Sequence, residues 1–497
     1  MKQQAEYIGV HSCLSVGQYT GDMGVDNWGD QRWRMELNNH HVLVMTMTIF
    51  KNLLASNKIR LSQVNLLIFD ECHHAVKNHD YVQIMRMFRP YIKVGDDIPR
   101  RLGLTASLIP SKCKPGDIER KILELEEILA CRSQTAGDLQ QVAKYATNPD
   151  QEIVFYDPSR CSEEGKLLED SLQFLQLMKK ECETEFYELV KLYLDDCLHI
   201  LTNLGVWCAH QCAVGGLTEL HAAIKETGSD FESEWDRSLL HMGWTQLKLF
   251  TDMCSTSIEK CKGQKDQTPL TPKVKKLFDH LINGASPKKD LRGIVFVERR
   301  TTASILVKLI EHKSKRGGEM GHIRCACVVG HNEGRRGTHL RREAHMKTGK
   351  QTAVLSKFRS GKVNLLVATS VVEEGVDVPK CNSVIRFDFP PNFRSYIQSK
   401  GRARAKESKY ILLLEEGEEG MKRQAELEDY SVLEKELQSI CRGRSVPGEE
   451  DILKRMEELV IPYRPYGREG PVAMLANSLS LIHRSVYACN VSTTACS

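Results

Sequence analysis

Hydrophobic and polar positions follow three successive patterns along the chain. Between about residues 40 and 157, short apolar runs alternate with helical stretches; the runs are HVLVMT, NLLIFD, RLGLT and EIVFY. Strands that alternate with helices are typical of a parallel α/β sheet. The same rhythm returns between about residues 271 and 415 with GIVFVE, CACVVG, VNLLVAT, SVIRFD and YILLL. The pattern therefore predicts two α/β domains, the first of them entered partway through.

Between these two regions, from about Cys161 to Cys261, the strand pattern is absent. Leu, Ile, Phe and Trp recur there at spacings of three and four residues, which is the period of amphipathic helices. This part predicts an all-helical insertion. Beyond the second α/β region, Met421–Ile440 and Asp451–Leu459 predict charged amphipathic helices separated by the breaker run RGRSVPGEE.

Composition narrows the class of protein. The chain has 497 residues, of which 41% are hydrophobic and 27% charged, as expected for a soluble protein of several globular domains. The 17 Cys contain no repeated CxxC and follow no secretory leader, so we expect reduced thiols and a cytoplasmic location. The apolar runs have strand length, so no membrane partner is expected. The net charge of +4 does not by itself predict a nucleic-acid partner.

The stretch LLIFDECHHA, from Leu66 to Ala75, ends a predicted strand in two adjacent carboxylates. Asp70 can hold Mg²⁺ through water while Glu71 orients or deprotonates an attacking water. The alternative is that DECH lies on an ordinary surface turn. The stretch LTAS at Leu104–Ser107 ends the next predicted strand.

A second set of polar side chains follows in QSKGRARA. Gln398, Arg402 and Arg404 supply an amide and two guanidiniums within about one helical turn. Guanidiniums that reach a γ-phosphate from a second domain raise phosphoryl-transfer rates by roughly 10³ to 10⁵. An RxR pair taken alone is more typical of a solvated surface.

In this order and spacing, the motifs resemble those of superfamily 2 helicases of the DExD/H type. More narrowly, DECHHA, GLTAS, IVFVERRTTA, ATSVVEEGVDVPKCN and IRFDFPPNFRSYIQSKGRARA, with the helical insertion, resemble the helicase region of Dicer. The resemblance implies two RecA-like lobes at residues 1–158 and 266–415, the insertion at 159–265 and pincer helices at 416–465. Residues 466–497 resemble the beginning of the dsRNA-binding-fold domain that follows the helicase in Dicer.

The resemblance also implies roles for single residues. Asp70 and Glu71 would hold Mg²⁺ and position water, and His73 would couple to the other lobe. Gly375, Asp377, Gln398, Arg402 and Arg404 would serve the nucleotide from the second lobe. The residues implied to contact the RNA backbone or to link hydrolysis to RNA are Thr46, Thr105, Ser107, Gly330, His331 and Thr369. Lys400 occupies a position where many relatives carry Arg.

The phosphate-binding loop of such enzymes, G-x-x-x-x-G-K-[ST], does not occur in the sequence. Gly349–Lys350, Gly361–Lys362 and Gly165–Lys166 are not followed by Ser or Thr. MKQQAEYI resembles the helix that follows the first RNA-contacting strand, so the loop is expected upstream of Met1. We expect ATP and Mg²⁺ to serve the intact parent and to bind weakly or not at all to this chain alone. No paired acidic RNase III signature is present either, so cleavage of RNA is not expected of this polypeptide.

Three further groups have a functional and a structural interpretation. The run GHNEGRRGTHLRREAH, with Lys313, Lys315 and Arg316, concentrates positive charge that suits RNA phosphates or, equally well, a solvated loop. Trp207, Cys208, His210 and Cys212 offer metal-binding atoms, but they lie in an apolar helical pattern that favours core packing. His74 is expected to be exposed.

The function expected from the resemblance is that of a Dicer helicase module, which binds double-stranded RNA and couples ATP hydrolysis to RNA processing in RNA interference. Its expected partners are double-stranded RNA and a dsRNA-binding protein that contacts the insertion. One alternative is a short, ATPase-deficient protein that regulates by binding RNA or a partner. Another is an innate RNA-sensor helicase, which would need a signalling or zinc-bearing domain that the sequence does not show. Whether this chain by itself is an enzyme stays open.

Overall fold

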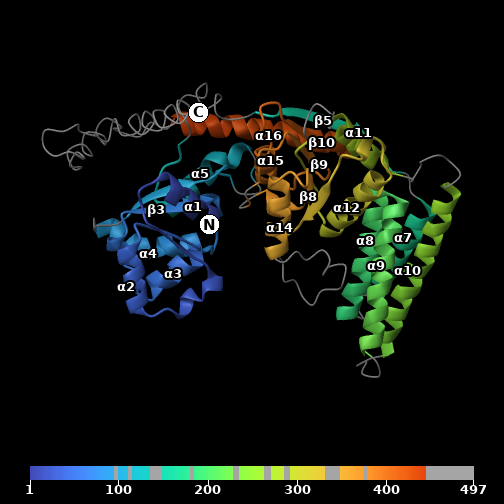
Figure 1. The fold of residues 1–497 in the computed structure, drawn as a ribbon, viewed down its shortest axis with the longest axis horizontal. Helices are drawn as coiled ribbons and strands as arrows, with labels where there is room; N and C mark the ends of the chain where they lie inside the picture. The colour runs from blue at the N-terminus through green and yellow to red at the C-terminus, as the bar shows by residue number, and fades with distance from the viewer. Residues whose placement is uncertain are drawn as a thin grey trace, which may run out of the picture. The chain divides into compact units, whose positions relative to one another are not determined.

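The structure is a computed structural model that describes residues 1–94, 99–109, 113, 115–134, 148–159, 162–178, 184–227, 234–261, 270–284, 291–330, 348–373, 376 and 378–443. Figure 1 shows the arrangement of the elements in these ranges. The chain divides into two compact units, and almost all described residues before Lys435 belong to the first.

The N-terminal lobe contains two pairs of parallel strands. In one pair β1 (Val16–Tyr19) lies beside β2 (Val42–Met45), and in the other β3 (Leu66–Asp70) lies beside β4 (Arg100–Leu104). The helices of this lobe are α1 (Lys2–His11), α2 (Asp30–Asn39), α3 (Met47–Ala55), α4 (Asp80–Val94) and α5 (Ile118–Leu129). Trp33, Phe69 and Phe88 are almost completely buried in its apolar core. The lobe therefore has a core of its own, as the alternating pattern predicted.

The second lobe is built on a six-stranded sheet with the strand order β5-β10-β9-β6-β8-β7, in which every neighbouring pair is parallel. Its strands β6 and β8 are apolar and fully buried, and β9 is buried except at Ser383, because helices cover a parallel sheet. The strands are β5 (Asp150–Tyr156), β6 (Gly293–Phe296), β7 (Cys325–Val328), β8 (Leu365–Ala368), β9 (Ser383–Arg386) and β10 (Lys409–Glu415). The helices of this lobe are α11 (Pro272–Gly284), α12 (Arg300–Lys315), α14 (Thr348–Arg359) and α15 (Phe393–Lys400).

One strand lies in a different sheet from the one the sequence indicated. The run EIVFY was assigned to the first α/β domain, but β5 pairs along its whole length with β10 of the second sheet. Tyr156 at its end packs in the core of the second lobe. Alternation of strands and helices along a sequence shows that a strand exists, but it does not show which sheet edge the strand joins.

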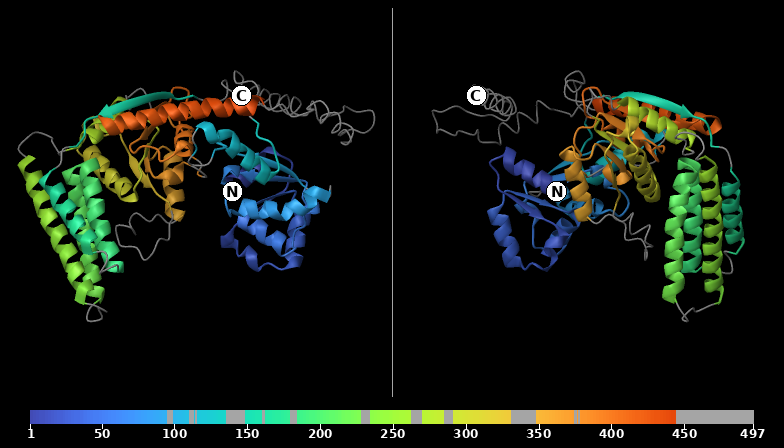
Figure 2. Two further views of the ribbon diagram at one scale, coloured as in Figure 1. Left: turned by 180° about the vertical axis from the view of Figure 1, so that it is seen from behind. Right: turned by 45° about the vertical axis from the view of Figure 1, so that its right-hand side comes forward.

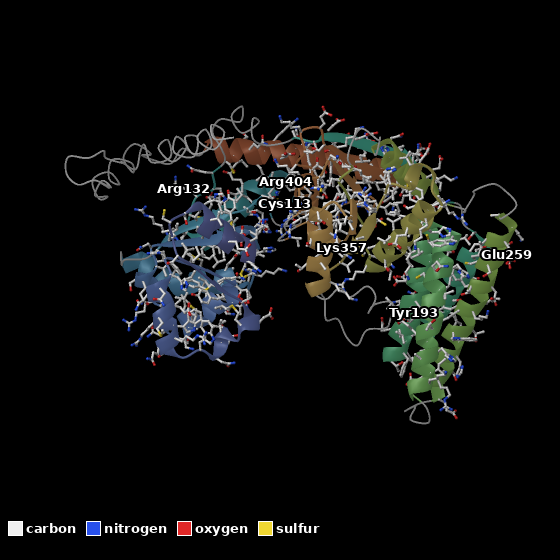
Figure 3. All side chains as sticks on the ribbon, viewed as in Figure 1. Cys113, Arg132, Tyr193, Glu259, Lys357 and Arg404 are labelled. Atoms are coloured by element: carbon white, nitrogen blue, oxygen red, sulfur yellow. The ribbon has the colours of Figure 1, made fainter. Side chains whose placement is uncertain are left out.

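The insertion is helical, as expected, and consists of α7 (Glu163–Met178), α8 (Glu185–Leu204), α9 (Val206–Thr227) and α10 (Glu234–Cys261). These helices stand side by side in both views of Figure 2. Tyr193 of α8, labelled in Figure 3, donates a hydrogen bond to the buried Glu219 of α9. Cys208 and Cys212 are buried in the same core, which confirms the packing interpretation of these two thiols.

The insertion and the second lobe share one continuous apolar core, which includes residues of α8, α9, α11, α12 and the sheet. Polar contacts add to it: Arg299 Nη1 lies 2.7 Å from Asp195 Oδ2 and 3.3 Å from Asp196 Oδ1. Trp207 of α9 lies against the ring of His312 of α12, with ring centroids 4.9 Å apart. The insertion is therefore packed directly on the second lobe.

The first C-terminal helix, α16 (Glu418–Gly443), is continuous over the predicted range Met421–Ile440. Its Tyr430 packs against Phe393 and Tyr396 of α15 with both ring centroids 5.5 Å away. The second predicted helix, Asp451–Leu459, lies outside the described residues. Within the described part of the chain, no helix is both long and apolar enough to cross a membrane.

Candidate functional site

The two motifs of the N-terminal lobe lie at neighbouring strand ends. Strands β3 and β4 are parallel and in register, so that Asp70 is paired with Leu104. Because the carboxyl ends of parallel strands open at the same edge of a sheet, DECH and LTAS face the same region. Both motifs therefore lie at strand ends, as expected, and the pairing of β3 with β4 brings them together.

Glu71 has a backbone conformation that sequence reasoning did not foresee. Its φ of 50° and ψ of 50° are left-handed, which is uncommon for a residue with a side chain and costs of order 1–3 kcal/mol. The turn allows the Glu71 amide to donate to Asp70 Oδ1 at 3.1 Å. Asp70 Oδ2 accepts a hydrogen bond from Gln4 of α1, and Asp70 stays exposed.

His73 connects the two motifs. Its side chain is buried, and Nδ1 lies 2.7 Å from Thr105 Oγ1 and 3.3 Å from Glu71 Oε2. Thr105 Oγ1 also donates to the Ser107 carbonyl at 2.8 Å and accepts from the Ser107 amide at 3.2 Å. The arrangement joins the acidic motif to the hydroxyl motif through one imidazole. Coupling of His73 to the other lobe stays a prediction.

Cys72 of the same motif serves packing. A Cβ on Gly103 would lie 2.8 Å from Cys72 Sγ and 3.1 Å from Cys72 Cβ, so the close contact of Cys72 with β4 favours glycine at that position. Burial, with smaller contributions from Cys131 and Glu71, raises the pKa of the Cys72 thiol to about 12. Cys72 therefore stays a protonated, apolar group.

A second group of predicted residues gathers at the ends of β7 and β8. These strands are paired so that Val328 lies beside Ala368, and the buried Thr369 follows directly. A Cβ on Gly330 would lie 3.4 Å from Val371 Cγ2 in the turn after Thr369. Gly330 and Thr369 are thus neighbours in space although about 40 residues separate them in the chain.

The prediction that Gln398, Arg402 and Arg404 lie within about one helical turn is wrong, because α15 ends at Lys400 and only Gln398 lies on it. Gln398 is buried, Arg402 is half-buried and Arg404 is exposed. Arg402 Nη1 donates to the Val376 carbonyl at 2.9 Å, and Nη2 donates to the Glu373 carbonyl at 2.8 Å. Arg404, labelled in Figure 3, donates through Nε to the Gly401 carbonyl at 3.1 Å. Arg402 therefore holds the loop after β8 in the structure, whereas its contact with a nucleotide stays a prediction.

Three predicted residues, Gly375, Asp377 and His331, lie outside the described residues, as does most of the basic run GHNEGRRGTHLRREAH. Of the basic side chains described, Lys313 and Lys315 occupy the last turn of α12 and Arg316 follows it directly. Cations at the C-terminal end of a helix are stabilised by its dipole, so this position has a structural explanation as well.

Family models cover most of the chain. A Dicer partner-binding domain matches residues 162–261, a helicase conserved C-terminal domain matches 272–406, and the res subunit of type III restriction enzymes matches 13–109. Endoribonuclease Dicer of Danio rerio is 35% identical over 495 residues, which is 88% of this chain. The sequence contains a Dicer helicase region.

Other relatives extend this similarity beyond vertebrates. Endoribonuclease dcr-1 of Caenorhabditis elegans is 29% identical and covers 97% of this chain. The chain spans about a quarter of the length of these Dicer relatives, 26% in both cases. Among solved structures, the Hef helicase domain of Pyrococcus furiosus is 22% identical with a TM-score of 0.49, covering 85% of this chain and 86% of its own.

This Dicer helicase region contains a buried ion pair that sequence reasoning missed. Arg386 Nη1 lies 2.6 Å from Glu373 Oε1, and Ser395 Oγ donates to the same oxygen at 2.8 Å. Lys400, in turn, lies 3.6 Å from Glu434 of α16, which gives this position a structural partner. The available signal was the doubled Glu of VVEEGVD and the Arg of IRFD, two charges within otherwise apolar runs.

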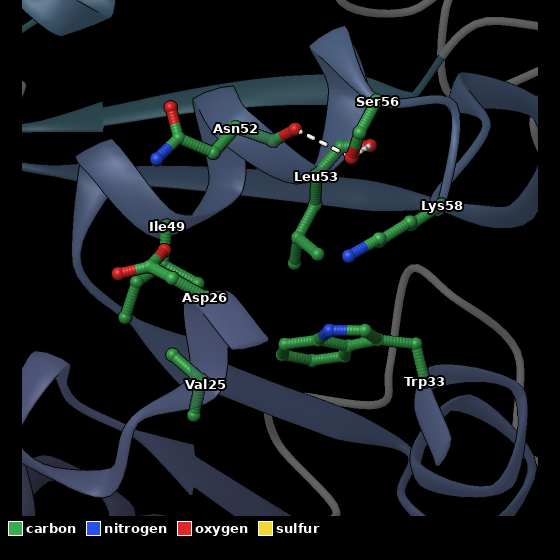
Figure 4. A pocket seen from close by; sticks show the side chains of 8 residues that line it. All are labelled: Val25, Asp26, Trp33, Ile49, Asn52, Leu53, Ser56 and Lys58. Carbon is green, nitrogen blue, oxygen red and sulfur yellow. Dashed lines mark hydrogen bonds between the residues drawn. The ribbon is translucent and has the colours of Figure 1, made fainter. Parts of the chain in front are cut away.

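One pocket of the N-terminal lobe contains none of the predicted site residues. Figure 4 shows the eight side chains that line it, among them the buried indole of Trp33 and the ammonium of Lys58. The Lys58 ammonium donates to the Trp28 carbonyl at 2.8 Å, and Ser56 Oγ donates to the Asn52 carbonyl at 2.7 Å. The Lys58 contact ties the segment after α3 to the turn at Trp28, and the Ser56 contact caps the C-terminal end of α3, so the pocket has a structural explanation.

Proposed function

We propose that this chain is the part of a Dicer-like endoribonuclease that binds double-stranded RNA and, in the intact protein, couples ATP hydrolysis to RNA processing in RNA interference. The observation that carries the proposal is the contact of His73 with Thr105 and Glu71. It unites a carboxylate pair suited to Mg²⁺ and water with a hydroxyl motif at the neighbouring strand end.

The first lobe has side chains that fit Mg²⁺. Within the described ranges no three His, Cys, Asp or Glu residues form a metal-binding group. Mg²⁺ beside a nucleotide usually takes one or two protein carboxylates, the rest of its ligands being phosphate and water. Asp70, which is exposed at the strand end, fits that role, and Glu71 lies beside it. ATP and Mg²⁺ are therefore proposed cofactors of the intact protein, with the phosphates bound by a G-x-x-x-x-G-K-[ST] loop that this sequence does not contain.

For RNA we propose contacts to the backbone rather than to bases. Thr46 caps the N-terminal end of α3, where its Oγ1 accepts from the Ile49 amide, and Thr369 and Gly330 lie at two adjacent strand ends. Hydroxyls and backbone amides at strand ends and helix starts suit phosphate oxygens, and A-form RNA is recognised mainly through its shape, phosphates and 2′-hydroxyls.

We propose that a dsRNA-binding protein contacts the helical insertion. The support is the match of residues 162–261 to a Dicer partner-binding domain. The same match favours Dicer over an innate RNA-sensor helicase. The absence of GK[ST] from the sequence favours the alternative that this chain alone binds RNA or a partner without turning over ATP. A cytoplasmic location is part of the proposal, supported by free thiols such as the exposed Cys13.

The test is binding of the full chain to double-stranded RNA, measured by fluorescence anisotropy over a series of salt concentrations. The dissociation constant should rise steeply with salt because phosphate contacts release counterions. Double-stranded DNA of the same sequence should bind more weakly because it lacks 2′-hydroxyls. No detectable RNA binding at low salt would refute the proposal.

A parallel arm measures phosphate release with ATP and Mg²⁺, comparing wild type with Glu71→Gln. We expect no turnover by this chain alone. RNA-stimulated release that disappears in Glu71→Gln but persists in the surface control Asp252→Asn would instead assign a complete active site to it.

A further inference from the structure

A network of alternating charges runs through the interior of the second lobe. Each member contacts the next, and the four central residues are all buried. The network extends from the helical insertion to the loop after β8. We call it the charge network, and its members are Asn203, Lys273, Asp388, Arg386, Glu373 and Arg402.

Its first contacts join the insertion to the sheet. Lys273 Nζ of α11 donates to Asn203 Oδ1 of α8 at 2.9 Å and to Asp388 Oδ1 at 2.9 Å. The backbone carbonyl of Asn203 also accepts from Thr271 Oγ1 at 2.7 Å. Asn203 is therefore held by two residues at the beginning of the second lobe.

Its next contacts run along β9. The Asp388 carbonyl accepts from Arg386 Nε at 3.2 Å, while Asp388 Oδ2 accepts from the Glu298 amide at 2.8 Å. Arg386 then reaches Glu373 through Nη1, and its guanidinium carbon lies 5.3 Å from the centroid of the Phe296 ring. The guanidinium thus bridges β9 and the loop after β8.

Glu373 is the branching point at the far end. Its carboxylate accepts from Arg386 and Ser395, and its backbone carbonyl accepts from Arg402. Its amide donates to the Ser370 carbonyl at 2.9 Å, which closes the turn that follows Thr369. The backbone of Glu373 therefore holds the loop proposed to contact RNA, while its carboxylate binds Ser395 of the helix that precedes Arg402.

Packing alone does not require this network. The insertion and the second lobe already share a continuous apolar core, and replacing a buried ion pair by apolar residues is often neutral or stabilising. Although burial disfavours both charges, Asp388 raises the pKa of Lys273, and Lys273 lowers the pKa of Asp388, so both stay charged. A charged network retained inside a sufficient core points to a role in fixing positions.

We propose that Lys273, Asp388, Arg386 and Glu373 are positioning residues that couple the helical insertion to Arg402 and the loop after β8. A protein that binds the insertion would thereby change how this loop holds RNA. The inference rests on the proposed function for its RNA and partner arms. The coupling itself is a property of the folded chain.

The experiment is a double-mutant cycle in the full chain with Asn203→Ala and Glu373→Gln. Asn203→Ala removes the acceptor for Lys273 and leaves the Lys273–Asp388 pair in place. Glu373→Gln keeps the size of the side chain and removes its charge. The first readout is hydrogen exchange at the amides of Val372 and Glu373, which form the turn after Thr369. The second readout is the affinity for double-stranded RNA.

We expect each single variant to increase exchange at these amides. The effect of the double variant should depart at least about twofold from the product of the single effects, since coupled sites are non-additive whereas distant independent sites are nearly additive. The matched control is Arg299→Gln, which breaks another contact between the insertion and the second lobe without touching the network. In the double variant Arg299→Gln/Glu373→Gln, the change in exchange should equal the product of the two single effects.

The proposal is overturned if the exchange effect of the Asn203→Ala/Glu373→Gln double variant equals the product of the single effects. It is also overturned if the cycle with Arg299→Gln departs from its product by as much as the cycle with Asn203→Ala. If Glu373→Gln does not fold, Ser395→Ala replaces it, because it removes one hydrogen bond from the same carboxylate. If wild type binds no RNA, the proposed function fails, while the exchange cycle still decides the coupling.

Discussion

Gly243 of α10 allows a close approach between two helices of the insertion. A Cβ at this position would lie 2.6 Å from Val190 Cγ1 and 2.7 Å from Cγ2, well inside van der Waals contact. Val190 on α8 is fully buried, and a β-branched side chain in a helix has essentially one χ1 rotamer. Neither side can move away, so Gly243→Ala should force α8 and α10 apart.

The magnitude follows from two opposing terms. Alanine in a helix interior is favoured over glycine by about 1 kcal/mol. Overpacking a close-packed core costs about 1–3 kcal/mol. We therefore expect net destabilisation of up to about 2 kcal/mol. The control is Gly349→Ala in the first turn of α14, where a Cβ would meet nothing within 4 Å, so no overpacking opposes the substitution.

Because a chain of several domains does not unfold in one step, the assay should be local. Native-state hydrogen exchange gives the free energy of opening for the amides of α8 and α10. A second variant, Val190→Ala, removes the two methyl groups that clash. Val190→Ala should destabilise the helices by itself. The double variant Gly243→Ala/Val190→Ala should nevertheless lose less free energy of opening than the two single variants lose in sum. The reasoning is refuted if Gly243→Ala stabilises these helices as Gly349→Ala stabilises α14, or if Val190→Ala gives no rescue.

Three further outcomes are expected. Burial, together with Arg299, lowers the pKa of His199 to about 4, so His199 contributes stability that is complete above pH 6.5 and is lost as pH falls towards 4. The loss amounts to up to about 3 kcal/mol in the free energy of unfolding. When that free energy is measured against pH, His199→Gln should show a shallower slope between pH 6.5 and 4 than wild type or the exposed control His241→Gln. Thr46→Ala should destabilise α3 by about 1 kcal/mol, because it removes the acceptor for the Ile49 amide, while Thr46→Ser should not; exchange at α3 amides measures this. Tyr430→Ala should release α16 from α15 at a cost of about 3–5 kcal/mol, read from exchange in α16, whereas Tyr430→Phe keeps the ring contacts and should retain most of the docking.

The sequence by itself determined those features that depend on local pattern. The helical insertion follows from apolar spacing of three and four residues, and the strand ends that carry Asp70 and Thr105 follow from short apolar runs that stop at polar residues. The sequence placed the acidic and hydroxyl motifs at strand ends, whereas the pairing of β3 with β4, whose carboxyl ends open at one edge, brings the two motifs together.

Tertiary structure decided everything that depends on contacts between distant segments. The strand Asp150–Tyr156 joins the second sheet because the free edge of β10 accepts it, and no property of its own seven residues specifies that edge. The left-handed turn at Glu71 and the use of Arg402 by two loop carbonyls are likewise set by neighbours in space. The charge network joins Asn203 to residues about 70 to 200 positions further along the chain. Such pairings depend on three-dimensional packing and geometric complementarity, which a linear pattern of residue types does not encode.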